Sequence, residues 1–163
     1  MLHLIPPRLH RIGLRLAHAV RKHWWRLAKV QLNGCRVLAF DEAGRLLLIR
    51  HSYGSGNWML PGGGIARGEE PLAAAQRELA EETGCSLQDA FAHSVVEEPL
   101  YGTTNRVHMI AGRAVGQPRP DGREIIELGF FARDGLPSHL SPAVVSQIDG
   151  WFEAFDLNGR DQA

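Results

Sequence analysis

The chain has 163 residues, of which 44% are hydrophobic and 22% charged; this balance fits one globular domain and excludes fibrous, disordered and disulfide-rich classes. Two cysteines, Cys35 and Cys85, are too few for a thiolate zinc site or a disulfide framework, so a reducing cytoplasm is the expected location. No apolar run approaches the roughly 20 residues that a membrane-spanning helix needs.

The formal net charge of zero is the sum of a basic segment and an acidic segment. Residues 1–30 contain seven Lys and Arg residues and no acid, so residues 31–163 carry a net charge of −7. Overall charge therefore gives no support for nucleic-acid binding, and only the N-terminal segment offers a basic surface.

Residues 1–30 are predicted to form an amphipathic basic helix, because apolar residues recur at spacings of three and four with Arg and Lys between them. These apolar residues are Leu9, Ile12, Leu16, Val20, Trp24 and Leu27. We favour packing of this stripe on the main domain, residues 31–163, or on a second subunit in a homodimer. Contact with a membrane surface or a nucleic acid is the less favoured alternative.

The main domain is predicted to be α/β. Segments 35–40 and 46–51 form a hairpin around the turn Asp41–Gly44, and further strands are expected near 91–98, 105–115 and 124–132. Helices are expected over 71–83, with Pro71 first and Gly84 as terminator, and over about 142–155, with Ser141 as N-cap. Strands followed by a helix, more strands and another helix predict a mixed sheet covered by helices.

The helix over 71–83 carries three carboxylates beside its apolar stripe. The stripe that should face the sheet consists of Leu72, Ala75 and Leu79. Glu78, Glu81 and Glu82 all project to one side of that stripe, with Glu81 farthest from it. Glu78 and Glu82 are a like-charge i,i+4 pair, which is unfavourable unless a cation lies between them. Mg²⁺ or Mn²⁺ would suit such oxygen ligands, and a solvated acidic face is the alternative.

A glycine-rich loop precedes this helix, and together they follow a fixed spacing. Gly63, Glu69, Arg77, Glu78, Leu79, Glu81, Glu82 and Gly84 fit the pattern G-x5-E-x7-R-E-U-x-E-E-x-G-U, in which U is a bulky aliphatic residue. The last position holds Cys85, a departure that affects packing more than chemistry. This segment resembles the Nudix box, and the resemblance extends over roughly residues 33–155.

The resemblance implies a Nudix-like α/β/α sandwich and a Mg²⁺- or Mn²⁺-dependent pyrophosphohydrolase. The substrate would be a nucleoside diphosphate linked to a group X: an ADP-ribose-like compound, a dinucleoside polyphosphate or a nucleoside triphosphate. The implied metal ligands are Gly63, Glu78, Glu81 and Glu82, with Glu81 alternatively a general base. Glu69 would pair with Arg77 as structural support. A non-catalytic nucleotide sensor on the same fold is the alternative function.

The resemblance also implies a further acid from the strand near residues 124–132. Glu124 fits best and Glu127 next, and because residues three apart in a strand point to opposite faces, at most one should reach the site. Exposed edge acids that limit aggregation are the alternative for each.

The sequence gives less information about the substrate than about the reaction. The candidate substrate-binding residues are Arg50, Tyr53, Trp58 and Tyr101. In the family the residue about 16 positions after the box is a guide: Tyr101 there suggests dinucleoside polyphosphates, whereas Pro99, two positions earlier, would suggest ADP-ribose.

Overall fold

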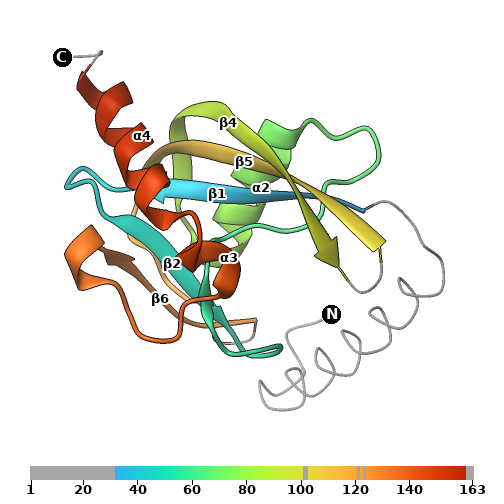
Figure 1. Ribbon diagram of the computed structural model, residues 1–163, viewed down its shortest axis with the longest axis horizontal. Helices are drawn as coiled ribbons and strands as arrows, with labels where there is room; N and C mark the ends of the chain where they lie inside the picture. Colours follow the sequence, from blue (N-terminus) through green and yellow to red (C-terminus); the bar gives the residue numbers. More distant parts are fainter. Residues whose placement is uncertain (1–31, 101–102, 121, 123, 161–163) are drawn as a thin grey trace.

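The computed structural model describes residues 32–100, 103–120, 122 and 124–160 (Figure 1). Its elements are β1 (Leu32–Phe40), β2 (Leu46–His51), β3 (Trp58–Met59), α2 (Pro71–Thr83), β4 (Ser86–Leu100), β5 (Thr103–Val115), β6 (Ile125–Phe131), a 3₁₀ turn (Arg133–Gly135), α3 (Pro142–Val145) and α4 (Ile148–Arg160). The predicted helix at residues 1–30 lies outside the described residues, and the domain division at residue 31 stays a prediction. None of the described helices combines the length and hydropathy of a membrane-spanning segment.

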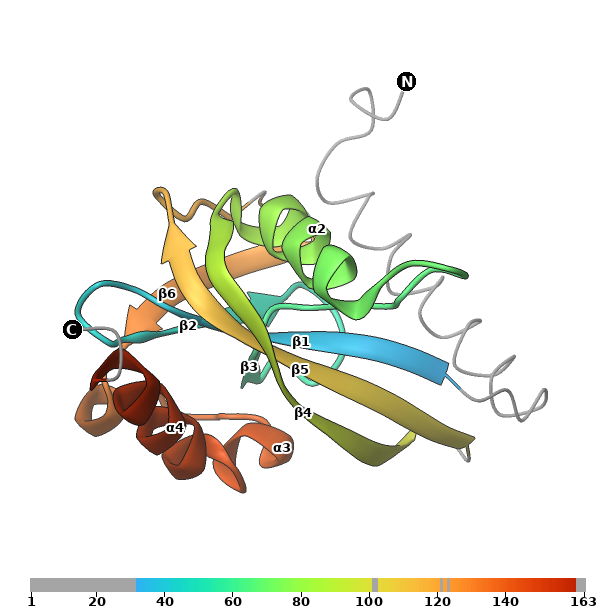
Figure 2. The same ribbon diagram turned by 90° about the horizontal axis from the view of Figure 1, so that it is seen from above.

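A six-stranded mixed sheet forms the middle layer, with the strand order β3-β2-β1-β5-β4 and with β6 on β2. The helix α2 covers one face, and α3 and α4 cover the other (Figure 2). Alternation along β1 sends Val37 into the core with Leu79 of α2, and sends Leu38 and Phe40 into the core with Trp151 of α4. A sheet buried on both faces explains why residues 37–40 of β1 and 46–49 of β2 are continuously apolar. The predicted α/β/α sandwich is confirmed.

The helix α2 has the predicted bounds. Pro71 occupies its first turn, and Gly84 ends it with a φ of +73° while its N–H bonds to the carbonyl of Ala80. Ala75 and Leu79 face the sheet as expected. The prediction for Leu72 is wrong: its side chain is 37% exposed, because the first turn of α2 faces a hollow over β4 and β5 rather than packed strand.

The predicted hairpin is correct only at its turn. β1 and β2 pair at Phe40 and Leu46 and then separate. The loop after β3 takes over this edge of β1: the N–H groups of Cys35 and Val37 donate to the carbonyls of Gly63 and Pro61, both at 2.9 Å. β2 pairs instead with β6 and β3, and β1 pairs in parallel with β5.

Other boundaries also differ from the predicted ones. β4 and β5 are longer than expected, since they form one extended antiparallel ribbon. The last helix is broken into α3 and α4 near Ser146, whose hydroxyl bonds to the carbonyl of Ala143 and competes with helix continuation. Ser141 stands at the N-cap position in an extended conformation, but its side chain makes no capping hydrogen bond.

Candidate active site

The glycine loop, residues 61–64, lies between β1 and the carboxylates of α2. Gly62 has a φ of +140°, and a side chain there would meet the backbone of Cys35 and Arg36. Its N–H donates to Oε2 of Glu82 at 2.8 Å. The loop therefore contacts the strand on one side and fixes a carboxylate of the helix on the other.

Glu82 is the buried member of the carboxylate set, with only 8% of the residue exposed. Its pKa is raised to about 8, mainly by burial and also by the negative charges of Glu78 and Glu124, while the Gly62 N–H and the charge of Arg36 act in the opposite direction. Three carboxylates from two distant parts of the chain thus act on one another around Glu82.

Glu124 approaches Glu82 from the segment that leads into β6. Its backbone carbonyl accepts the Ser52 N–H at 2.8 Å, and its carboxylate accepts a hydrogen bond from the hydroxyl of Tyr53. Glu127 is placed differently, because Nη2 of Arg50 lies 2.6 Å from its Oε1. The alternation of the strand therefore separates the two acids, and Glu124 is the one that lies near α2.

Arg77 ties the loop to the helix. Its guanidinium donates to both carboxylate oxygens of Glu69, at 2.9 and 3.1 Å, and to the carbonyl of Gly64 at 3.1 Å. Glu69 also accepts the N–H of Ala66 at 2.8 Å. The hydrogen bonds from Arg77 lower the pKa of Glu69 to about 2, and those to Glu69 and Glu78 raise the pKa of Arg77 above its usual value.

The same guanidinium contacts two more acids. Nη1 of Arg77 lies 2.8 Å from Oε1 of Glu78 and 3.4 Å from Oε2 of Glu81, which is the most exposed carboxylate of the box. Gly63 lies directly against Glu78, since a Cβ on Gly63 would fall 2.5 Å from the Glu78 carboxylate. The glycine is therefore required for the loop to approach this acid.

The donor chemistry fits a hard divalent cation. The facing groups are the carboxylates of Glu78, Glu82 and Glu124, and their mutual repulsion is what a cation would relieve. The carbonyl of Gly63 accepts the Cys35 N–H and retains a second lone pair. Among the described residues, no three His, Cys, Asp or Glu side chains already surround one point at ligand distance, and Arg77 holds Glu78 instead.

The candidate substrate residues are dispersed. Arg50 is engaged by Glu127, and Tyr53 contacts Glu124 and lies with its ring 4.9 Å from that of His51. Trp58 packs edge-to-face on Phe131 and belongs to the wall of the core on the α4 side. Tyr101 lies outside the described residues.

Several contributors were not predicted from the sequence in their observed roles. Gly62 supplies the N–H to Glu82, Arg36 supplies a nearby positive charge, and Nε2 of His51 lies 3.7 Å from Glu82. The run of three glycines was the available signal for Gly62. Arg36 and His51 lie on strands whose pairing with the loop and with β6 cannot be inferred from local spacing.

Both the sequence and the fold of this chain are similar to those of known proteins. The sequence model of the NUDIX domain matches residues 31–154. A protein of Mycobacterium tuberculosis provisionally named 8-oxo-dGTP diphosphatase 2 is 38% identical over 87 residues, which cover 50% of this chain and 57% of that protein. An RNA pyrophosphohydrolase of Azorhizobium caulinodans is 35% identical over 126 residues, 72% of each chain.

One curated relative is named for a different reaction. An isopentenyl-diphosphate Delta-isomerase of Streptomyces griseus is 33% identical over 129 residues, 71% of this chain and 63% of that protein. The crystal structure of a MutT NUDIX hydrolase from Burkholderia pseudomallei superimposes with a TM-score of 0.66 at 30% identity, covering 74% of this chain and 97% of that one. This chain spans about half the length of the first curated relatives that it matches.

The matched segment covers the sheet, the glycine loop and all the carboxylates described above, and the structural match has the same fold. Members of this family generally use divalent metal ions, in agreement with the donor chemistry of the site. By its sequence and by its architecture, the chain belongs to the NUDIX family.

Proposed function

We propose that this chain is a Mg²⁺- or Mn²⁺-dependent pyrophosphohydrolase that cleaves a phosphoanhydride bond in a nucleoside diphosphate linked to a second group. The observation that carries the proposal is the carboxylate of Glu82, which holds a proton more tightly than an ordinary glutamate, first because it is buried and then because of the charges of Glu78 and Glu124. A domain without a cationic ligand has no need to hold three carboxylates in this arrangement. The names of the diphosphatase and pyrophosphohydrolase relatives support the reaction type.

Glu78, Glu82 and the carbonyl of Gly63 are the groups that we assign to the metal. When bound, a divalent cation neutralises the closely spaced charges of a pyrophosphate and polarises the bond to be cleaved. Gly62 fixes one oxygen of Glu82, and we assign the other, which lies 3.7 Å from Nε2 of His51, to the ion. Arg77 would release Glu78 to the cation while it keeps its two bonds to Glu69, so the loop stays in place.

Two acids compete for the role of general base. Glu81 is exposed on the helix and is held by a 3.4 Å contact to Arg77, so it can turn toward an incoming water or a second ion. Glu124 is oriented by the Tyr53 hydroxyl and faces Glu82. Either carboxylate can accept a proton from the attacking water in this position.

The nucleoside has a natural place beside Glu124. A hollow of about 470 Å³ lies there, lined by His51, Ser52, Tyr53, the glycine turn 54–56 and Ile126. This volume lies within the usual range for small-molecule sites, roughly 300–1,000 Å³. Tyr53 supplies an aromatic wall, and His51 lies between this hollow and Glu82.

A hydrolysis screen tests the proposal. Dinucleoside polyphosphates, nucleoside diphosphate sugars, nucleoside triphosphates with 8-oxo-dGTP included, and 5′-triphosphorylated RNA are incubated with Mg²⁺ in ¹⁸O-labelled water, and the labelled phosphate is located by ³¹P NMR. Isopentenyl diphosphate is included as an isomerase substrate. We expect hydrolysis of at least one nucleotide. Isomerisation alone, or nucleotide binding without turnover, would replace the hydrolase with an isomerase or with a sensor.

Matched variants connect the turnover to the site. Glu78→Gln should lower kcat at least about a hundredfold, because electrostatic stabilisation of the transition state supplies most of the rate enhancement at sites of this kind. Glu124→Gln should also lower kcat, whereas Glu127→Gln on the same segment is the control, since its carboxylate is engaged by Arg50. Equal effects of the last two variants would contradict the assignment of Glu124.

A further inference from the structure

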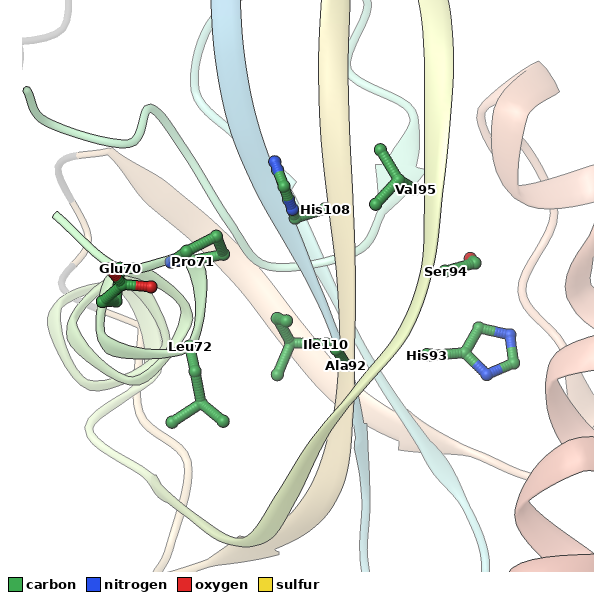
Figure 3. A pocket seen from close by; sticks show the side chains of 9 residues that line it. All are labelled: Glu70, Pro71, Leu72, Ala92, His93, Ser94, Val95, His108 and Ile110. Atoms are coloured by element: carbon green, nitrogen blue, oxygen red, sulfur yellow. The ribbon is translucent and has the colours of Figure 1, made fainter. Parts of the chain in front are cut away.

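A hollow opens over the sheet beside the first turn of α2, on the face away from α4 (Figure 3). Its volume is about 310 Å³, and Leu72 lines it from the helix while Ala92, Val95, His108 and Ile110 line it from β4 and β5. It lies apart from the carboxylate cluster, which is built on the last two turns of α2. The proposed hydrolysis makes no use of it.

Part of the lining of this hollow is apolar and exposed. Four large hydrophobic side chains are exposed in the described part of the chain, and two of them are Val95, at 48%, and Leu72, at 37%. The register of the ribbon, with Val95 opposite His108 and Ala92 opposite Ile110, puts these side chains on one face. Grouped exposed apolar side chains of this kind mark an interaction surface.

The start of β1 lies next to this surface. Leu32 pairs with Asn105, and Cys35 pairs with His108 in the wall of the hollow. Leu32 and Cys35 are three positions apart along the strand, which is about 10 Å. Residues 28–31 can span up to about 14 Å when extended, so this length of chain is sufficient to bridge the start of β1 and the hollow.

We propose that the apolar stripe of residues 9–27 docks over this hollow in its own chain. The stripe has helical spacing and would be about 27 Å long, and the sheet face from Ile110 to Thr104 extends for about 20 Å. Leu72 and Val95 would be removed from water by the apolar residues of the stripe.

Charge and tethering favour this occupant. Residues 1–30 carry a charge of +7 against −7 for the remainder, and Glu70 lies at the rim of the hollow. A segment joined by a short linker is present at an effective concentration in the millimolar range, well above that of a second copy at working dilution. Salt should weaken the docking only in part, because screening does not affect the apolar contribution.

Hydrogen exchange of the full chain tests the docking. Val95→Glu places a charge in the proposed contact, and Val145→Glu is the matched control, because Val145 is also exposed, at 59%, but belongs to α3 on the opposite face. We expect amides of residues 9–27 to exchange slowly in the wild type and in Val145→Glu, and at least about tenfold faster in Val95→Glu. Exchange within β1 and β5 reports whether the fold is intact.

Two results would overturn the proposal. In the first, residues 9–27 exchange in Val95→Glu as slowly as in the wild type while β1 and β5 stay protected. If Val95→Glu does not fold, the same exchange measurement is made on Leu72→Gln, a milder change on the opposite wall. The other is protection that disappears on dilution together with a dimer in sedimentation velocity, because the occupant is then a second copy of the chain.

Discussion

The buried carboxylate of Glu82 makes the stability of the metal-free protein depend on pH in a defined direction. Its pKa is raised from 4.5 to about 8, first by burial and then by Glu78 and Glu124. The folded state therefore holds this proton more tightly than the unfolded state does. The stabilisation is fully present below about pH 4.5 and is lost as the pH rises through about 8.

The size of this effect follows from the same values. The difference between a pKa of about 8 and the ordinary 4.5 contributes at most about 5 kcal/mol to the free energy of unfolding. Each tenfold change in proton affinity accounts for about 1.4 kcal/mol of it. Part of this free energy is shared with Glu78 and Glu124, because their charges interact with Glu82. For a domain of this size, 1 kcal/mol shifts Tm by about 2–4 °C, so a loss on the order of 10 °C is expected between pH 5 and pH 9.

Thermal unfolding with chelator present, measured from pH 5 to pH 9, compares the wild type with Glu82→Gln. The variant keeps an oxygen to accept the Gly62 N–H but has no charge to desolvate, so its Tm should vary much less over this window. Adding Mg²⁺ at pH 8 should raise the Tm of the wild type and should have little effect on the variant. Parallel pH profiles for the two proteins would refute the reasoning.

Three further results are expected. Glu69→Gln should lower Tm clearly and kcat only slightly, because Glu69 holds the loop in place through Arg77. A large loss of kcat at unchanged Tm would contradict this. Chelator should abolish turnover and Mg²⁺ or Mn²⁺ should restore it, with Zn²⁺ a poor substitute for oxygen ligands; undiminished turnover in chelator would exclude the metal. Tyr53→Phe should lower kcat about tenfold with little change in KM, since it removes a charge-assisted bond to Glu124, and wild-type kinetics would show that this bond does not orient the acid.

The local elements were determined by the sequence alone. Pro71 and Gly84 set both ends of α2, because the one suits a first turn and the other tolerates the left-handed conformation that ends a helix. Helical periodicity was enough to place Glu78 and Glu82 on one side of the core and Glu81 farther out. The spacing of the box identified the family for the same reason, since all of its positions lie within one loop, one helix and the two residues that follow the helix.

Contacts between distant residues were decided only by the tertiary structure. Two segments, β2 and the glycine loop, can pair with the same edge of β1. Local periodicity does not indicate which of the two pairs with it. Glu124 approaches Glu82 from 42 positions along the chain because β6 pairs with β2 in one particular register. The exposure of Leu72 likewise depends on where the first turn of α2 lies relative to the sheet beneath it. Local spacing defines which side chains share a face, and only the packing of the faces defines what they meet.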